Sequence, residues 1–225
     1  MQGIKKISRK ILNMITILLT LFFTLGCVGT NPVKNDSDKQ IAPPLLTDYF
    51  PLNMETQWLY SVARGTDITE EICTLVEITS GDDDITYWSR IQGDRWVNGF
   101  ISAQGISLRT ENDISFQPPL HLLHQHIQAG DEIVTNANLE TEDAALPIIV
   151  TSVLNGLEDV TTPGGVYKDC IHYIVYLNKT TETGAKGFAW REEWLAKGIG
   201  VVKNLVYDYE GNLQSESVLK KIEVK

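Results

Sequence analysis

Three histidines, His121, His124 and His126, have the side chains and the spacing that could support metal chemistry. On a strand, His124 and His126 would point to the same face, whereas on a helical turn His121 and His124 would be neighbours. Imidazoles placed in this way can bind zinc or copper, with Asp131 or Glu132 as an acidic third ligand. The alternative is a polar surface segment in which histidine recurs, because neither an HExxH motif nor a cysteine pair accompanies the cluster.

Cys170 and His172 are two residues apart and would share one face of a strand. A cysteine protease also needs a helix or a cation that lowers the pKa of its thiol, so we interpret this pair as structural. The sequence contains neither a GxSxG elbow nor a GxxxxGKS/T phosphate loop. Adjacent carboxylates such as Glu192 and Glu193 point to opposite faces of a strand and do not converge. These residues favour a protein that is not an enzyme, and a metal-dependent hydrolase built on the histidines is the catalytic alternative.

The N-terminal residues are arranged like an export signal. A positively charged start precedes an almost wholly apolar run over residues 11–25, then Gly26 and Cys27; the charges come from Lys5, Lys6, Arg9 and Lys10. The apolar run is shorter than the about 20 residues that a comfortable membrane span needs. A charged start, a short apolar core and a small residue before the cut are typical of a secretory signal. We therefore expect residues 1–26 to be a signal helix that is removed.

The stretch Thr24-Leu25-Gly26-Cys27 resembles the lipobox of bacterial lipoproteins. In that family the cysteine thiol receives a diacylglycerol, the signal is cut before the cysteine, and the new amine is usually acylated. The resemblance therefore implies a diacylglycerol and an N-acyl chain such as palmitate on Cys27, and no other cofactor. Thr24 and Leu25 depart from the usual pattern, which has Leu three residues before the cysteine and a small residue two before. An ordinary cleaved signal, or an uncleaved anchor, is the alternative.

Acylation of Cys27 would place the protein at the cell envelope, because two or three acyl chains hold a protein stably on a membrane. Val28 follows the cysteine. In Gram-negative lipoproteins an Asp at that position usually marks retention in the inner membrane. The resemblance therefore implies the periplasmic face of the outer membrane if the source is Gram-negative.

The chain after the signal is acidic. Residues 29–46 are rich in Asn, Asp, Lys, Ser and Pro, so we expect residues 27–46 to be a flexible tether ahead of a single domain over residues 47–225. Of the 19 basic residues four precede Cys27, so the mature chain has 15 against 29 acidic residues, a net charge of −14. Such a surface repels phosphate backbones and anionic head groups, which disfavours nucleic acid as a partner and electrostatic docking on lipid.

Cys73 and Cys170 remain once Cys27 carries the lipid. An exported protein meets conditions that permit disulfides. A Cys73–Cys170 bridge would close a long loop and stabilise the fold by roughly 4 kcal/mol in the chain-entropy description. The alternative is two unpaired thiols that pack as small hydrophobic side chains.

Alternation of apolar and polar residues between turn signals dominates the rest of the sequence. Residues 57–63 place Trp58, Tyr60 and Val62 on one face of a strand, and the next strand groups Ile72, Thr74, Val76 and Ile78. Residues 120–127 fit either a strand or a single helical turn, and Asn155-Gly156 is a good turn dipeptide. We predict an all-β antiparallel meander that curls into an open or closed barrel, with a β-sandwich as the alternative.

Further stretches resemble a loose group of uncharacterised bacterial lipoproteins and secreted β proteins. They are Tyr49-Phe50-Pro51 leading to Trp58 and Tyr60, residues 162–170 (TPGGVYKDC), and residues 193–203 (EWLAKGIGVVK). The group tends to share a "YFP…WxY" start and a "WxAxGIGxVK" hairpin. The resemblance implies a β-rich envelope domain and supplies no catalytic residues.

The function predicted from these observations is binding by a lipid-anchored envelope protein. The ligand would be an apolar small molecule held in a hollow of the curved sheet, or the partner would be another envelope protein at a sheet edge. A purely structural component of an envelope assembly is a third possibility. The residues expected to line a hollow are the five tryptophans Trp58, Trp88, Trp96, Trp190 and Trp194.

Overall fold

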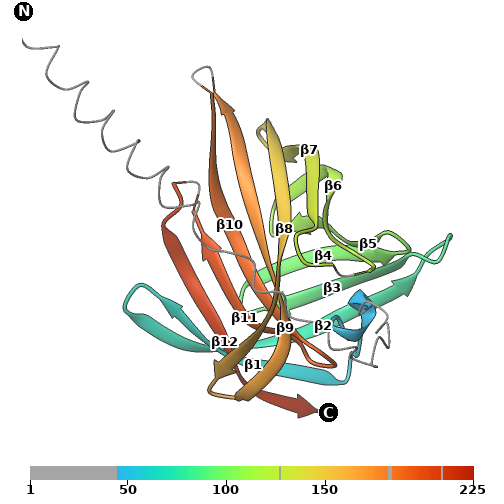
Figure 1. The fold of residues 1–225 in the computed structure, drawn as a ribbon, viewed down its shortest axis with the longest axis vertical. Coiled ribbons are helices and arrows are strands. Elements are labelled where there is room, and N and C mark those ends of the chain that lie inside the picture. The colour runs from blue at the N-terminus through green and yellow to red at the C-terminus, as the bar shows by residue number, and fades with distance from the viewer. Residues whose placement is uncertain (1–44, 127, 182–183, 209) are drawn as a thin grey trace, which may run out of the picture. The chain divides into compact units, whose positions relative to one another are not determined.

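A computed structural model of the chain shows a closed barrel of twelve antiparallel strands (Figure 1). It describes residues 45–126, 128–181, 184–208 and 210–225. A one-turn 3-10 helix, η1 (Leu46–Asp48), comes first. The strands are β1 (Thr56–Arg64), β2 (Asp67–Ser80), β3 (Thr86–Gln92), β4 (Arg95–Ser102), β5 (Gly105–Glu111), β6 (Ile114–His124), β7 (Glu132–Glu140), β8 (Ala145–Thr162), β9 (Gly165–Thr181), β10 (Gly184–Ala196), β11 (Gly200–Tyr207) and β12 (Leu213–Val224).

Each strand pairs with the next along the chain, and β12 returns to pair with β1. The predicted all-β antiparallel meander is therefore confirmed, and its barrel is closed, not open; the β-sandwich alternative is wrong. The signal helix expected in residues 1–26 lies outside the described residues. Within the described part of the chain, we find no helix whose length and apolar character would suffice to cross a bilayer.

The predicted alternation is correct in β1 and has the opposite phase in the first part of β2. Trp58, Tyr60 and Val62 are buried as expected. In the first part of β2 the side chains that reach the core are Cys73 and Leu75, whereas Ile72 and Val76 of the predicted face are exposed, Ile72 to 52%. A β-bulge between Leu75 and Glu77 lets two residues of β2 face one residue of β3, and after it Ile78 packs against the core as predicted.

The predicted turn at Asn155-Gly156 is absent, because β8 runs through it without a break. Gly156 has a φ of 139° and lies at a β-bulge in the pairing with β9. Glycine adopts that conformation without a steric penalty, so the dipeptide bends the strand and does not end it. Residues 120–124, which fit two predictions, belong to strand β6.

The pairing between β6 and β7 covers only a short part of the two strands. Ser115–Gln117 pair with Asn138–Glu140, and β7 pairs along its whole length with β8. Among the described residues, the edge of β7 over residues 132–137 therefore has no strand paired with it on the side of β6. Val134 on this edge is 55% exposed.

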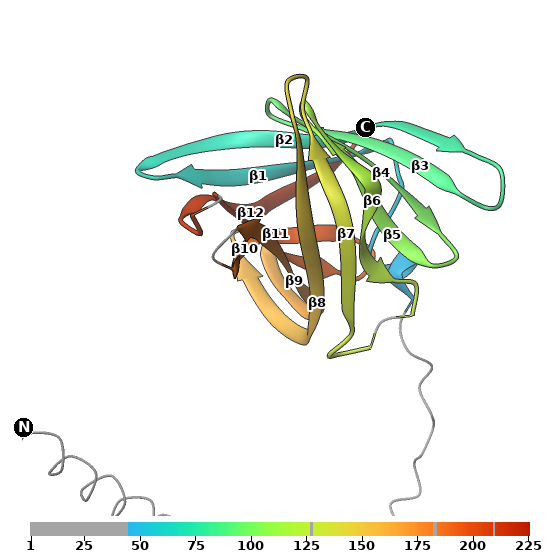
Figure 2. The same cartoon turned by 90° about the horizontal axis from the view of Figure 1, so that it is seen from above.

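The segment before β1 closes one mouth of the barrel, and we call residues 45–52 the plug. The Leu46 amide donates to the Gln125 carbonyl (2.9 Å), and the Gly198 amide donates to the Asp48 carbonyl (2.7 Å). The plug thus joins the end of β6 to the turn between β10 and β11, and Figure 2 shows η1 beside the ends of β5 and β6. The tether was expected to extend to residue 46, but Leu46 is fully buried and belongs to the barrel.

Two adjacent leucines test whether the plug is part of the folded core. Leu46→Ala should lower the free energy of unfolding by about 2–5 kcal/mol, because it removes a fully buried side chain. Leu45→Ala is the matched control: its side chain is 39% exposed, so the loss should stay below about 1 kcal/mol. Urea denaturation of both variants measures the difference, and equal losses would contradict an integral plug.

Candidate functional site

Five charged side chains meet inside the barrel, and we call them the charged belt. Arg90, Arg95 and Glu111 come from β3, β4 and β5, while Arg191 and Glu193 come from β10 on the other side of the interior. Arg95 contacts Glu111 at 2.6 Å, and Arg191 bonds to the second oxygen of the same carboxylate. Arg90 and Arg191 lie 3.5 and 3.8 Å from Glu193. Ion pairs therefore connect opposite walls of the barrel.

Burial and mutual attraction set the ionisation of the belt. Burial alone would raise the pKa of Glu111, but Arg191 and Arg95 outweigh it and lower that pKa from 4.5 to about 2. For Glu193, Arg90 and Arg191 likewise outweigh burial and lower the pKa. Burial, followed by repulsion from Arg191, lowers the pKa of Arg95. The carboxylates are thus charged at neutral pH, and the guanidinium groups crowd one another.

The belt contains one more guanidinium than carboxylate. Arg95 Nη2 and Arg191 Nε are buried and have no hydrogen-bond partner. Glu71 is bonded to Arg64, so its charge is already matched. An unpartnered buried donor costs about 1–3 kcal/mol, so the belt has capacity for a further acceptor.

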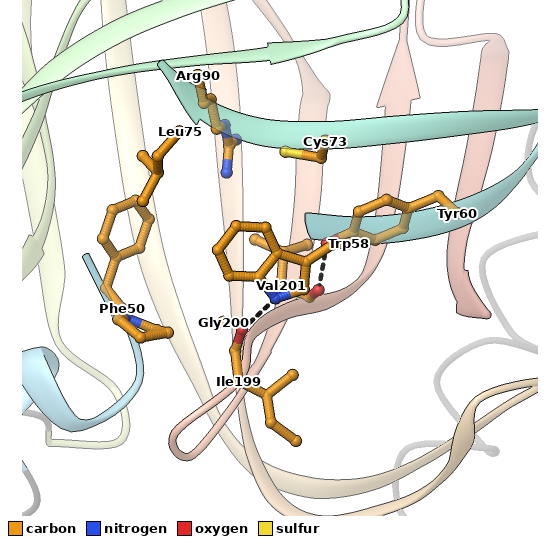
Figure 3. A pocket seen from close by; sticks show the side chains of 10 residues that line it. Phe50, Trp58, Tyr60, Cys73, Leu75, Arg90, Ile199, Gly200 and Val201 are labelled. Carbon is orange, nitrogen blue, oxygen red and sulfur yellow. Dashed lines mark hydrogen bonds between the residues drawn. The ribbon is translucent and has the colours of Figure 1, made fainter. Parts of the chain in front are cut away.

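A small cavity of about 30 Å³ lies between the belt and the plug. Figure 3 shows Arg90 entering it from β3, opposite Phe50 and Trp58. Its walls are mostly apolar or aromatic, and the lining consists of Phe50, Pro51, Trp58, Tyr60, Cys73, Leu75, Arg90, Ile199, Gly200 and Val201. A water needs roughly 10–15 Å³ by this measure, so the cavity has room for about two waters.

Most polar groups of the cavity wall are already satisfied. The Trp58 indole donates to the Ile199 carbonyl at 2.8 Å, and the Tyr60 hydroxyl donates to the Val201 carbonyl at 2.6 Å (Figure 3). On the plug side, Phe50 packs against Trp88 with ring centroids 5.2 Å apart. A molecule larger than the cavity would have to displace Phe50 and Pro51.

Larger hollows are open grooves on the barrel wall. One of about 420 Å³ is lined mainly by polar side chains of β2–β5, including Glu77, Asn98 and Arg109. Another of about 390 Å³ lies where β6 separates from β7 and β8. Neither combines an apolar enclosure with a buried charge, as ligand sites commonly do.

The five tryptophans do not gather around one hollow. Trp58 lines the cavity, and Trp88 reaches it through Phe50. Trp96 is 41% exposed, Trp190 packs on Phe116, and Trp194 stacks on His172 at 4.2 Å. The predicted set is therefore wrong as a group, although Trp58 belongs to the cavity and Trp88 lies beside it.

The histidines do not assemble a metal site. His121 and His124 have ring centroids 5.3 Å apart, but His121 Nδ1 interacts with Ser107 Oγ at 3.2 Å. Burial, then the nearby His124, lowers the pKa of His121. His126 lies in an isolated bridge to Leu45. Within the described ranges, no three His, Cys, Asp or Glu side chains are placed to hold a metal ion, including Asp131 and Glu132.

Of the two alternatives left open for Cys73 and Cys170, the structure has the unpaired one: no disulfide joins them, and both thiols are free and buried. Cys73 lines the cavity, whereas Cys170 Sγ lies 3.6 Å from the Tyr167 carbonyl. Burial raises the pKa of Cys170 to about 11, so this thiol is protonated at neutral pH and is a poor nucleophile. His172 contacts Glu158 (2.6 Å) and Glu192 (3.4 Å), not the thiol.

Sequence reasoning missed the charged belt. One signal was available: Arg90 follows Trp88 by two residues, and Arg191 and Glu193 precede Leu195 in the same phase. A charged residue at the buried phase of a strand indicates an interior partner of opposite charge. The prediction that Glu192 and Glu193 point to opposite faces agrees with the structure, in which Glu193 is 2% exposed inside the barrel and Glu192 accepts from the Tyr207 hydroxyl.

Acid should weaken the barrel through Glu111. Its pKa is lowered from 4.5 to about 2, so its contribution to stability is complete above pH 4.5 and disappears as the pH falls toward 2. This loss is on the order of 3 kcal/mol.

Urea denaturation between pH 5 and 2 measures the effect. Glu111→Gln should flatten this pH dependence and should cost about 3–5 kcal/mol at neutral pH, because it leaves buried guanidinium groups unpaired. Glu142→Gln, at an exposed carboxylate, is the control and should behave like the unchanged chain. An equally steep pH dependence in Glu111→Gln would contradict the role of the belt.

Comparison with known families gives one match. Residues 119–219 match the family described as DUF3108-like, which is less than half of the 225-residue chain. The matched region includes Arg191 and Glu193 but not Arg90, Arg95 or Glu111. No curated protein matches the chain.

Similar solved structures come from bacteria. A candidate lipoprotein of Parabacteroides distasonis ATCC 8503 has a TM-score of 0.49 and 13% identity, over 78% of this chain and 98% of that one. A candidate exported protein of Bacteroides fragilis NCTC 9343, described as having a YmcC-like fold, has a TM-score of 0.46 and 16% identity, over 78% and 98%. The hypothetical lipoprotein YmcC of Escherichia coli K12 has a TM-score of 0.42 and 12% identity, over 82% and 90%.

Proposed function

We propose that the protein is a lipid-anchored, non-catalytic binding protein of the cell envelope, and that its ligand is an apolar or amphipathic small molecule. The observation that carries this proposal is the cavity between the plug and the charged belt. This cavity combines an aromatic and aliphatic wall with one largely buried charged side chain, Arg90.

The size of the cavity defines how a ligand would enter. About 30 Å³ admits a few atoms, so a longer molecule needs Phe50 and Pro51 to move aside. These residues belong to the plug, which is held by backbone bonds at Leu46 and Asp48 and by the salt bridge Lys197–Asp48 (3.1 Å). Binding would therefore select a minor, opened form of the mouth, and the apparent affinity would be reduced by the fraction that is open.

The predicted anchor lies close to this mouth along the chain. Cys27 precedes Leu45 by 18 residues, which span at most about 60 Å when fully extended. The plug is thus within reach of the bilayer to which acylated Cys27 would hold the protein. An apolar ligand could pass between bilayer and barrel with a short aqueous path.

A second candidate is a binding role toward another envelope protein, which the edge of β7 favours. Residues 132–137 have no strand partner among the described residues on the side of β6, and exposed edges of this kind accept an added strand. The two candidates predict different results in the ligand measurement below, because strand addition needs no opening of the mouth.

Replacement of the acylated cysteine tests the anchor. Cys27→Ser should move the protein from the membrane fraction to the aqueous fraction and abolish incorporation of labelled palmitate, because the thiol that receives the lipid is gone. Cys170→Ser controls for the loss of any thiol and should remain in the membrane fraction. Unchanged fractionation of Cys27→Ser would contradict lipid anchoring.

Opening the mouth tests the binding site. Residues 27–225 carrying Cys27→Ser keep the whole barrel and are titrated with a fluorescent fatty-acid probe. Phe50→Ala should tighten saturable binding about two- to tenfold, because the ligand no longer has to break the pair with Trp88, worth about 0.5–1.5 kcal/mol.

Phe100→Ala is the matched control. Phe100 forms a similar aromatic pair with Tyr87, with centroids 5.9 Å apart, but does not line the cavity. Its affinity for the probe should equal that of the unchanged barrel. Absence of saturable binding would favour the β7 edge, and equal effects of the two variants would place the ligand elsewhere.

A further inference from the structure

Arg90 is the point at which the charged belt meets the cavity. Its side chain is 15% exposed and belongs to both groups. Its contact with Glu193 is 3.5 Å, longer than the 2.6 Å between Arg95 and Glu111. A guanidinium has five N–H donors in a planar fork, so one long contact leaves donors that can face the cavity.

The belt as a whole has an excess of positive charge. Three guanidinium groups face two carboxylates, and Arg95 Nη2 and Arg191 Nε lack partners although both are buried. The guanidinium groups of Arg191 and Arg95 repel each other, and a further negative charge near them would offset this repulsion. An anion beside Arg90 would therefore enter a potential that already favours it.

The polar atoms around Arg90 leave it as the group with spare donors. Trp58 Nε1 and the Tyr60 hydroxyl both donate to backbone carbonyls, and those bonds also occupy the carbonyls of Ile199 and Val201. Beyond them, the Cys73 thiol apart, the lining side chains are Phe50, Pro51 and Leu75, which offer only apolar surface. One end of the cavity thus suits an oxyanion and the other a hydrocarbon.

From this arrangement we infer that the ligand is an amphipathic anion whose carboxylate or phosphate head binds Arg90 and whose apolar chain leaves the barrel past Phe50 and Pro51. This inference rests on the proposed function and specifies its ligand class. The head group is deep in the mouth because Arg90 comes from the barrel wall, and the chain runs outward because the belt blocks the interior beyond. Carboxylates and phosphates both accept two parallel bonds from a guanidinium.

Ligands with the same chain length and different head groups measure the contribution of the head group to affinity. Dodecanoate, dodecyl phosphate, dodecanol and dodecylamine compete with the fluorescent fatty-acid probe for residues 27–225 carrying Cys27→Ser. At least one of the two anions should bind about tenfold or more tightly than the alcohol, since bonds to a charged group are worth that factor. The amine should compete least, because its charge repels Arg90.

The outcomes distinguish the inference from the proposed function. If the probe itself does not bind saturably, the proposed function fails. If dodecanol competes as well as both anions, the function stands and the inference is overturned. The tighter of the two anions identifies the head group.

Two arginine variants locate the head group. Arg90→Gln should remove the preference for the anion over the alcohol, whereas Arg109→Gln, at an exposed arginine of β5 that lies over Tyr87, should keep it. A retained preference in Arg90→Gln, or its loss in Arg109→Gln, overturns the inference. These variants report on position only if the barrel folds, so a further measurement uses the unchanged residues.

The further measurement, on the barrel with Arg90 unchanged, is carbon NMR of bound dodecanoate labelled at the carboxyl carbon. A carboxylate paired with a guanidinium is favoured in its charged form. The bound label should therefore keep its ionised chemical shift to a lower pH than the free acid does. A bound label that titrates at or above the pH of the free acid overturns the inference even if Arg90→Gln does not fold.

Discussion

The ion pairs that cross the barrel interior are the constraint on which the rest of the structure depends. Removing a charge from water costs several kcal/mol, and the cost is recovered only with a well-placed partner. Arg90, Arg95 and Glu111 lie on three consecutive strands, and their partners Arg191 and Glu193 lie on β10. These side chains can meet only if the sheet closes and β10 has one register relative to β5. A slip of one residue would turn Arg191 and Glu193 to the outside and leave Glu111 without its second guanidinium.

The belt also divides the interior into two chemically different ends. On one side Arg64, Glu71 and Gln92 form a polar end, with Gln92 3.4 Å from Ser217. On the other side the walls are apolar and the plug covers them. Stability alone does not account for the belt, because well-packed hydrophobic residues often replace buried ion pairs with no loss or with a gain. Binding of an anion at the apolar end would explain why an unmatched guanidinium lies at its border.

The alternation of apolar and polar residues was sufficient to predict an antiparallel β meander. The closure of the barrel and the faces of individual strands depend on pairing between distant residues, which the alternation does not contain. Alternation identified the strands and the meander, but closure depends on the pairing of β1 with β12, which no local signal encodes. Single-residue bulges changed the phase of burial within β2 and converted Asn155-Gly156 from a turn into a bend. The tryptophans were grouped because they are the same residue type. In the structure they lie apart, because each strand turns a different face to the core. Arg90 and Glu193 were missed because the strand phase indicates only that each charge is buried, whereas the closed sheet shows that the two side chains meet.

The plug connects the candidate site to the proposed anchor in a single stretch of chain. Leu46, which fixes the plug in the core, is four residues before Phe50, which covers the cavity, and 19 residues after Cys27. A ligand that displaces Phe50 would therefore act on the same short segment that holds the start of the barrel in place, but on a different contact, the pair with Trp88. The energies differ: an aromatic pair is worth about 0.5–1.5 kcal/mol, whereas burial of Leu46 is worth about 2–5 kcal/mol. In the proposed opening, Phe50 would therefore leave its position at a smaller energetic cost than Leu46, and the plug would stay attached to the barrel.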